Sequence, residues 1–293
     1  MSDKQRNLVI RAITGAFFVV LMVAGILYSC LSMTILFAII TGMTIWEYTG
    51  LINQSDKKII VNRFISTAAG VYLYLAFAGY CSGFVSSAAF IPYLLTIVYL
   101  FISELYTKNE NAINDWAYTM LAQMYIALPL SMTNVLAFLG TNDGSTEYTS
   151  ILPMSIFIFL WTNDTGAYCS GSLFGKHKLF PRISPGKTWE GSVGGGIFVI
   201  IAACLVYFLW ATNLENNGTI LSMMTITHWI GLGLVVVVFG TWGDLVESLF
   251  KRTLDIKDSG NILPGHGGML DRFDSSLMAI PAATIYLYTI TMF

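Results

Sequence analysis

The segment from residue 240 to residue 275 has the residue types that phosphate chemistry requires, and it reads GTWGDLVESLFKRTLDIKDSGNILPGHGGMLDRFDS. Four polar residues at i, i+3, i+4 and i+7 would share one face of a helix: Asp244, Glu247, Ser248 and Lys251. Asp271 and Asp274 repeat the i, i+3 relation further on. Carboxylates bind magnesium and cations neutralise phosphate, so the segment predicts nucleotide chemistry.

The stretch between the two acid pairs is rich in residues that favour turns: Pro264, Gly265, Gly267 and Gly268. Glycines let a backbone approach a ligand closely, and a turn leading into a helix N-terminus can hold phosphate with its N–H groups. Two simpler interpretations stay open. Asp244 and Glu247 could reach the membrane interface, and Asp271 and Asp274 could stabilise a helix N-terminus.

A second group of polar residues lies between residues 163 and 191. Asp164 falls within an apolar run, either as a functional group or, with Asn163, as a helix-packing contact. Ser184, Lys187 and Thr188 could cradle phosphate. Alternatively, Ser184 caps a helix that has proline at its first position, and Lys187 is solvated. Glu190 could be a capping partner or a buried acid, and the residues do not decide between them.

The C-terminal segment resembles the signature of the phosphatidate cytidylyltransferase (CDP-diacylglycerol synthase) family without a gap or a departure. The matching residues are Ser248, Lys251, Arg252, Lys257, Asp258, Gly260, Pro264, His266, Gly267, Gly268, Asp271, Arg272 and Asp274. Asn163–Lys178, which reads NDTGAYCSGSLFGKHK, and Ser184–Gly191, which reads SPGKTWEG, are similar to family segments in the same order.

The resemblance implies the reaction CTP + phosphatidate → CDP-diacylglycerol + diphosphate, with Mg²⁺, possible help from a monovalent cation such as K⁺, and a homodimer. No nucleic-acid partner is expected. The expected catalytic residues are Asp244, Lys251, Asp271 and Asp274. Asp244 and Asp271 are the principal expected metal ligands, with Asp274 and Asp164 as further candidates. The expected substrate-binding residues are Ser184, Lys187, Thr188, Ser248, Arg252, His266, Gly267, Gly268 and Arg272. A positioning role is expected for His266, because the phosphate of phosphatidate is already anionic.

The elements that would position these residues are membrane helices. The 293 residues are 55% hydrophobic and 11% charged, whereas soluble domains carry roughly a quarter charged residues. A membrane-spanning helix needs about 20 apolar residues. Nine runs qualify: Leu8–Tyr28, Leu31–Leu51, Phe64–Cys81, Phe84–Tyr106, Trp116–Leu139, Ser150–Ser170, Gly191–Thr212, His228–Phe250 and Ser275–Met292. We therefore expect an all-α, polytopic integral membrane protein. Residues 1–293 would form one transmembrane domain, with its site built from segments 163–191 and 240–275.

The basic residues predict how this domain is oriented. All 15 Lys and Arg residues lie at the N-terminus or in alternate connections, after the second, fourth, sixth and eighth runs. Basic residues are enriched in cytoplasmic loops. We therefore expect the N-terminus and the active site to face the cytoplasm, in a bacterial inner membrane.

Two other function classes are compatible with acidic residues inside membrane spans: an ion-coupled transporter and a membrane lipid or polyprenol kinase. A transporter commonly places its site near the bilayer midplane between inverted repeats. Here the acids gather near one face, and no internal repeat is visible. The kinase shares the phosphate chemistry and is distinguished by which phosphate it transfers.

Overall fold

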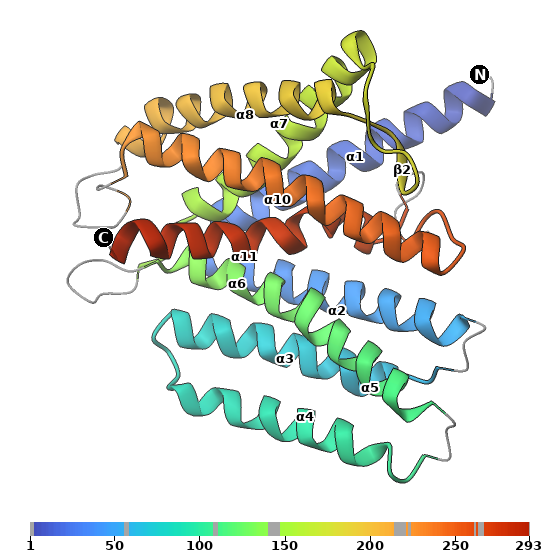
Figure 1. The fold of residues 1–293 in the computed structure, drawn as a ribbon. Helices are drawn as coiled ribbons and strands as arrows, with labels where there is room; N and C mark the ends of the chain where they lie inside the picture. The colour runs from blue at the N-terminus through green and yellow to red at the C-terminus, as the bar shows by residue number, and fades with distance from the viewer. Residues whose placement is uncertain are drawn as a thin grey trace. The chain divides into compact units, whose positions relative to one another are not determined.

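The computed structural model describes residues 3–55, 59–107, 111–139, 147–213, 221, 224–260, 262 and 267–292 (Figure 1). Its helices are α1 (Asp3–Tyr28), α2 (Cys30–Gln54), α3 (Arg63–Cys81), α4 (Ile91–Ser103), α5 (Ala112–Leu121), α6 (Leu128–Ala137), α7 (Ile151–Phe174), α8 (Trp189–Leu209), α10 (Ile226–Thr253) and α11 (Leu270–Met292). Each of the nine predicted runs is helical over most of its length, so the all-α prediction is confirmed.

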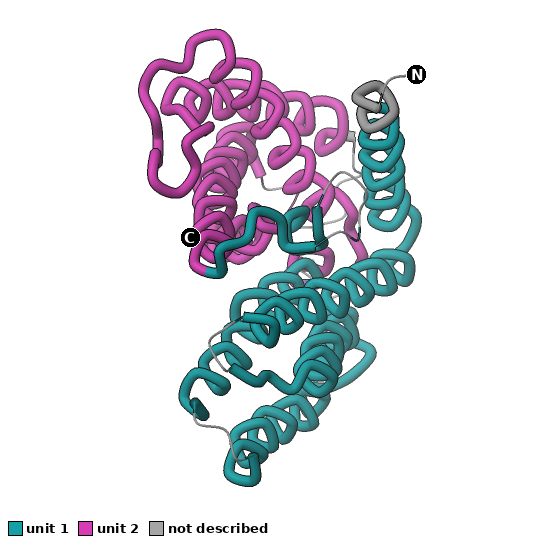
Figure 2. Tube along the Cα trace, turned by 90° about the vertical axis from the view of Figure 1, so that its right-hand side faces the viewer, with its two compact units in different colours: residues 1–134, 254–273 teal, residues 135–253, 274–293 magenta. Residues whose placement is uncertain are grey.

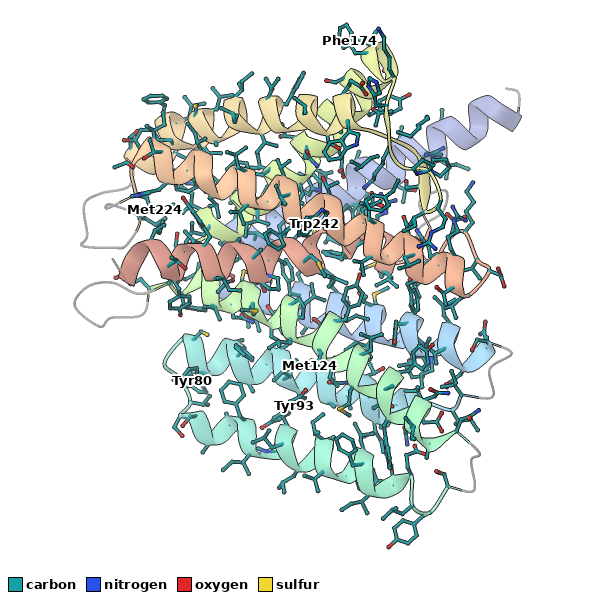
Figure 3. The ribbon with its side chains drawn as sticks, in the orientation of Figure 1. Tyr80, Tyr93, Met124, Phe174, Met224 and Trp242 are labelled. Carbon is teal, nitrogen blue, oxygen red and sulfur yellow. The ribbon has the colours of Figure 1, made fainter. Side chains whose placement is uncertain are left out.

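Helix length and composition fit a multi-pass membrane protein. Within the described ranges, six helical segments are long and apolar enough to cross a membrane: Val9–Tyr28, Cys30–Gln54, Arg63–Cys81, Ala112–Ala137, Trp189–Leu209 and Ile226–Thr253. Large apolar side chains are exposed along them, as Met124 and Trp242 illustrate at 62% and 53% exposure (Figure 3). Such surfaces are expected where lipid replaces water as the solvent.

The helices group into two compact units (Figure 2). Unit 1 comprises residues 1–134 and 254–273, and unit 2 comprises residues 135–253 and 274–293. That all of these residues form one transmembrane domain stays a prediction.

In unit 1, helix α2 packs against α1 and α3, and α3 packs against α4 (Figure 1). Phe37 of α2 lies 6.4 Å from the rings of both Tyr74 and Phe273. The turn between α1 and α2 is a single residue, Ser29, which forms a reciprocal capping box with Ser32. The first two predicted runs therefore form a tight helical hairpin.

Two of the predicted runs are less regular than expected. The fourth contains a 3₁₀ turn (Ser87–Phe90) before the short helix α4. The fifth contains a π-helical turn (Ala122–Ala127) between α5 and α6. In that turn the buried Gln123 donates from Nε2 to the carbonyl oxygen of Ser66 at 2.9 Å. A polar side chain that bonds across to α3 accompanies the irregularity.

In unit 2, α7 and α8 pack unusually closely because glycines line their contact. A Cβ atom at Gly191 would lie 2.9 Å from the carbonyl oxygen of Ala167, and one at Gly166 would lie 2.9 Å from Phe198. Small residues allow membrane helices to approach in this way. Helix α8 also packs against α10, so α7 and α10 flank it.

The connection between α7 and α8 is an antiparallel hairpin that the sequence analysis did not predict. Strand β1 (Lys178–Phe180) pairs with β2 (Ser184–Thr188). Because Ser184 lies in β2, the interpretation of Ser184 as a helix cap is wrong. The cap is Thr188, whose Oγ1 accepts from the backbone N–H of Gly191 at 3.1 Å.

Candidate active site

Unit 2 contains a cavity of about 440 Å³ between α7, the end of β2, α8, α10 and the start of α11. Its lining includes residues from both sequence segments singled out above. They are Asn163, Asp164, Ala167, Tyr168, Gly171, Ser172, Gly186, Lys187, Thr188, Gly191, Ser192, Gly240, Thr241, Asp244 and Ser275. Asp164, Lys187, Thr188 and Asp244, four of the predicted site residues, therefore share one cavity.

The charged pair of Lys187 and Asp244 is the central feature of this cavity. Lys187 Nζ lies 2.7 Å from Asp244 Oδ2, and both side chains are about one quarter to one third exposed. The hydroxyl of Ser248 donates to Asp244 Oδ1 at 3.2 Å, one turn along α10. Both oxygens of Asp244 are thus held in place by a cation and a hydroxyl.

Two further carboxylates surround this pair. Asp274, in the first turns of α11, lies within electrostatic range of Asp244, Asp164 and Lys187. Helices α10 and α11 come together here because residue 243 is glycine. A Cβ at Gly243 would lie 2.6 Å from the carbonyl oxygen of Asp274. The site therefore gathers three carboxylates and one ammonium group.

The donor set fits magnesium in chemistry, since Mg²⁺ prefers carboxylate oxygens and keeps several waters. In the described part of the chain, however, no three His, Cys, Asp or Glu side chains stand close enough to hold a metal as they lie. Lys187 occupies the position beside Asp244 instead. Metal binding here would require the Lys187 ammonium to move away from Asp244.

Lys251 and Glu247 form a second ion pair on the same face of α10. Lys251 Nζ lies 2.6 Å from Glu247 Oε2, and the Glu247 side chain is fully buried. The predicted shared face of Asp244, Glu247, Ser248 and Lys251 is confirmed by this pair and by the Ser248–Asp244 contact. Arg252 is exposed in the last turn of α10. The phosphate-binding roles of Lys251 and Arg252 stay predictions.

Glu190 anchors the hairpin that carries Lys187. Its carboxylate accepts from the backbone N–H groups of Lys176 and His177 at 3.1 and 3.2 Å, and it contacts His177 Nδ1 at 2.5 Å. Glu190 is thus neither a capping partner nor a buried acid, but the acceptor that ties the residues just before β1 to the start of α8. Ser184 lies at the other end of β2, outside the cavity lining.

Asn163 and Asp164 divide the two roles that the sequence left open for them. Asn163 is buried, and its Oδ1 lies against Gly195 of α8, where a Cβ would overlap it. Asp164 is exposed and lines the cavity. Asn163 is therefore a packing residue at the edge of the same cavity, and a functional role for Asp164 stays a prediction.

The rest of the predicted signature lies in unit 1. Asp271 Oδ2 accepts from the backbone N–H groups of Ser259 and Gly268, each at 2.8 Å, and lies 2.9 Å from Ser259 Oγ. Its carboxylate thus holds the loop before α11, and a metal-binding role for it stays a prediction. Gly267 has φ = +80°, which favours glycine, and Arg272 is exposed. His266, Pro264 and Gly265 lie outside the described residues.

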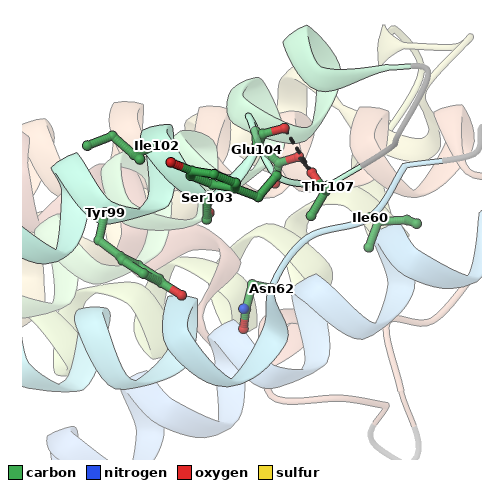
Figure 4. Close-up of a pocket in the computed structure, with 8 residues that line it drawn as sticks. Ile60, Asn62, Tyr99, Ile102, Ser103, Glu104 and Thr107 are labelled. Carbon is green, nitrogen blue, oxygen red and sulfur yellow. Dashed lines mark hydrogen bonds between the residues drawn. The ribbon is translucent and has the colours of Figure 1, made fainter.

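A larger cavity, of about 540 Å³, lies in unit 1 (Figure 4). It is lined by Ile60, Asn62, Tyr99, Ile102, Ser103, Glu104, Tyr106 and Thr107. Among the described residues, its one charged lining residue is Glu104, whose carboxylate accepts from Thr107 Oγ1 at 2.6 Å.

Comparison with known proteins agrees with the chemistry of the unit 2 cavity. A family model described as "Cytidylyltransferase family" matches residues 9–290. This chain belongs to the cytidylyltransferase family. A phosphatidate cytidylyltransferase of Haemophilus influenzae is 31% identical over 257 residues, which cover 83% of this chain and 85% of the relative. Phosphatidate cytidylyltransferases of Staphylococcus haemolyticus and Staphylococcus aureus are 40% and 39% identical over 181 and 183 residues. Those alignments span 62% of the length of the staphylococcal proteins.

Two residues that shape this family member's candidate site were not predicted from sequence. Gly243 sets the approach of α10 to α11, and its only sequence signal is a glycine next to an intramembrane acid. Glu47 contacts the signature loop in unit 1. Its signal was present, since Glu47 is an isolated acid within the apolar run Leu31–Leu51, and such residues are usually functional.

Proposed function

We propose that this protein is a membrane-bound phosphatidate cytidylyltransferase that converts CTP and phosphatidate to CDP-diacylglycerol and diphosphate. The observation that carries the proposal is the unit 2 cavity, which Lys187, Asp164 and Asp244 line in a chain of the cytidylyltransferase family. The names of the relatives supply the lipid substrate.

In the proposed reaction a phosphate oxygen of phosphatidate attacks the α-phosphorus of CTP. The bond from that phosphorus to the bridging oxygen breaks, and diphosphate leaves with the electron pair. Catalysis of such transfers is mostly positioning and charge neutralisation. Lys187 would turn from Asp244 to a phosphate oxygen, and the hydrogen bond from the Gly191 backbone N–H to Thr188 Oγ1 would hold the end of the hairpin in place beside it.

Asp244, with Asp274 and Asp164, would hold Mg²⁺ in the same cavity, because their oxygens are the ligands that this ion prefers. When bound, Mg²⁺ supplies charge neutralisation at the phosphate oxygens. The proposal includes a monovalent cation such as K⁺ only through the family resemblance. Asp271 enters as a further candidate ligand on the same ground.

The proposed setting is a bacterial inner membrane, with the site facing the cytoplasm and the acyl chains of phosphatidate remaining in the bilayer. The one-sided distribution of Lys and Arg supports this orientation. The exposed Tyr168 and Asp164 of α7 line the cavity and would meet the lipid head group. A homodimer is proposed from the resemblance alone.

The experiment uses purified protein in detergent–phosphatidate mixed micelles with CTP labelled at either the α- or the γ-phosphorus. A labelled lipid formed from α-labelled CTP alone supports the cytidylyltransferase. A labelled lipid formed from γ-labelled CTP would point to a kinase. Failure of both labels to enter lipid, with folded protein, would refute the proposal and leave a transporter as the remaining class.

A further inference from the structure

Glu47 is a buried acid in the C-terminal half of α2, with an exposed fraction of 7%. Its Oε1 accepts from Ser259 Oγ at 2.5 Å and from the backbone N–H of Leu270 at 3.0 Å. Its Oε2 accepts from the backbone N–H of Met269 at 3.0 Å. A carboxylate taken out of water needs such partners, and the first N–H groups of a helix provide them at the start of α11.

The loop before α11 is built around this carboxylate. A Cβ atom at Gly260 would lie 2.6 Å from Glu47 Oε2, and one at Gly268 would overlap the carboxylate itself. The two glycines of the signature therefore allow backbone to close over Glu47 from two sides. Any larger side chain at either position would force the carboxylate and the loop apart.

Ser259 links Glu47 to Asp271. The Ser259 hydroxyl lies 2.5 Å from Glu47 Oε1 and 2.9 Å from Asp271 Oδ2, while its backbone N–H donates to the same Asp271 oxygen at 2.8 Å. Gly268 N also donates to Asp271 Oδ2 at 2.8 Å. A displacement of Glu47 would therefore be transmitted through Ser259 and Gly268 to the Asp271 carboxylate.

We propose that Glu47 is a positioning residue, which holds Ser259, Met269 and Leu270 in place and so fixes the direction of the Asp271 carboxylate. The inference deepens the proposed function and rests on it, because Asp271 belongs to the family signature. Glu47 itself lies about 200 residues away in the sequence, outside that signature. It acts through hydrogen bonds to the loop.

The test compares Glu47→Gln, Ser259→Ala and the double variant with wild type, and uses Glu104→Gln as a matched control. Glutamine keeps the size of Glu47 but places an NH₂ group against donors on Ser259, Leu270 or Met269. Glu104 is an acid of the same unit whose carboxylate accepts from the hydroxyl of its neighbour Thr107 at 2.6 Å. The variants are measured by amide hydrogen exchange of the 259–271 segment and by kinetics with CTP, phosphatidate and Mg²⁺ varied separately.

We expect amide exchange of the 259–271 segment to rise roughly tenfold or more in Glu47→Gln, because bonds to a charged group are among the stronger ones. The value of kcat should fall by a similar factor while KM for CTP changes less than about threefold, since the effect reaches the site only through Asp271. Ser259→Ala should show the same pattern more weakly. The double variant should be no worse than Glu47→Gln, because both act through one hydrogen-bonded chain.

Unchanged exchange and kcat in folded Glu47→Gln would overturn the positioning role and leave the proposed function intact. A rise confined to KM, or an equal loss in Glu104→Gln, would also overturn it. If wild-type protein transferred no cytidylyl group, the proposed function would fail, whereas the exchange measurement would still decide whether Glu47 holds the loop. Ser259→Ala removes a single oxygen, so the inference remains testable even if Glu47→Gln does not fold.

Discussion

Replacing Lys187 with methionine separates a catalytic cation from a structural ion pair. Methionine keeps the apolar stem and removes the ammonium that lies 2.7 Å from Asp244. The pair is about one quarter to one third exposed, so its loss should lower the free energy of unfolding by only about 1 kcal/mol. Loss of a cation that stabilises charge on phosphate should instead reduce kcat by about 100- to 1,000-fold, or roughly 3–4 kcal/mol.

The removal of Lys187 also changes the cation requirement in a defined direction. Without the ammonium, Asp244 loses the cation of its ion pair, and the cavity that Asp164 also lines becomes more negative. The Mg²⁺ concentration for half-maximal activity should therefore fall even as kcat falls.

The assay is steady-state formation of CDP-diacylglycerol over a Mg²⁺ titration, together with thermal unfolding in detergent. Lys178→Met is the matched control, because it removes the same charge from β1 of the same hairpin, where Lys178 is exposed. We expect the control to retain wild-type kinetics. A kcat for Lys187→Met within threefold of wild type would refute the placement of Lys187 in the active site.

Three further predictions follow from packing, buried charge and topology. Gly243→Ala would place a Cβ against the backbone of α11, so it should destabilise the protein by about 1–3 kcal/mol and abolish turnover. The control Gly196→Ala, whose Cβ would meet one atom at 3.9 Å, should leave thermal unfolding and CDP-diacylglycerol formation unchanged. Lys251→Met should lower the unfolding free energy by about 3–5 kcal/mol, because it removes the ammonium that lies 2.6 Å from the buried Glu247 carboxylate. Adding Glu247→Gln should restore most of that loss, and equal melting temperatures of the single and double variants would contradict this. A reporter fused at the C-terminus should be extracytoplasmic and one inserted at residues 57–63 cytoplasmic, and detection of both on one side would contradict the proposed topology.

Hydropathy predicted the helices well because a backbone surrounded by lipid has no water with which to form hydrogen bonds. An apolar run of sufficient length must satisfy its own hydrogen bonds, so α2, α3 and α8 begin and end close to the predicted residues. The hairpin of β1 and β2 was not predicted, because it is short and lies in a polar connection where apolar and polar residues do not alternate as they do in a half-buried strand. The cap of α8 was misplaced for the same reason: Ser184 and Thr188 both precede the run, and only the hairpin decides between them.

The candidate site was predicted in composition but not in arrangement. Helical spacing was enough to place Asp244 and Ser248 side by side on α10. No local rule, however, relates Lys187 to Asp244 or Glu47 to Ser259, because those contacts depend on how distant segments pack. The family resemblance indicated which residues belong to the signature, and only the structure shows which side chains form ion pairs or hydrogen bonds with one another.

The most direct test of the proposed function is the transfer of α-labelled cytidylyl from CTP to phosphatidate by purified wild-type protein and by Asp244→Asn. Asparagine keeps the size of Asp244 and removes the charge that pairs with Lys187 and that Mg²⁺ would need. We predict labelled CDP-diacylglycerol and free diphosphate in equal amounts from wild type, and at least a hundredfold slower formation by folded, membrane-inserted Asp244→Asn. Wild-type rates from Asp244→Asn, or lipid labelling without diphosphate release, would contradict the placement of cytidylyl transfer in the unit 2 cavity.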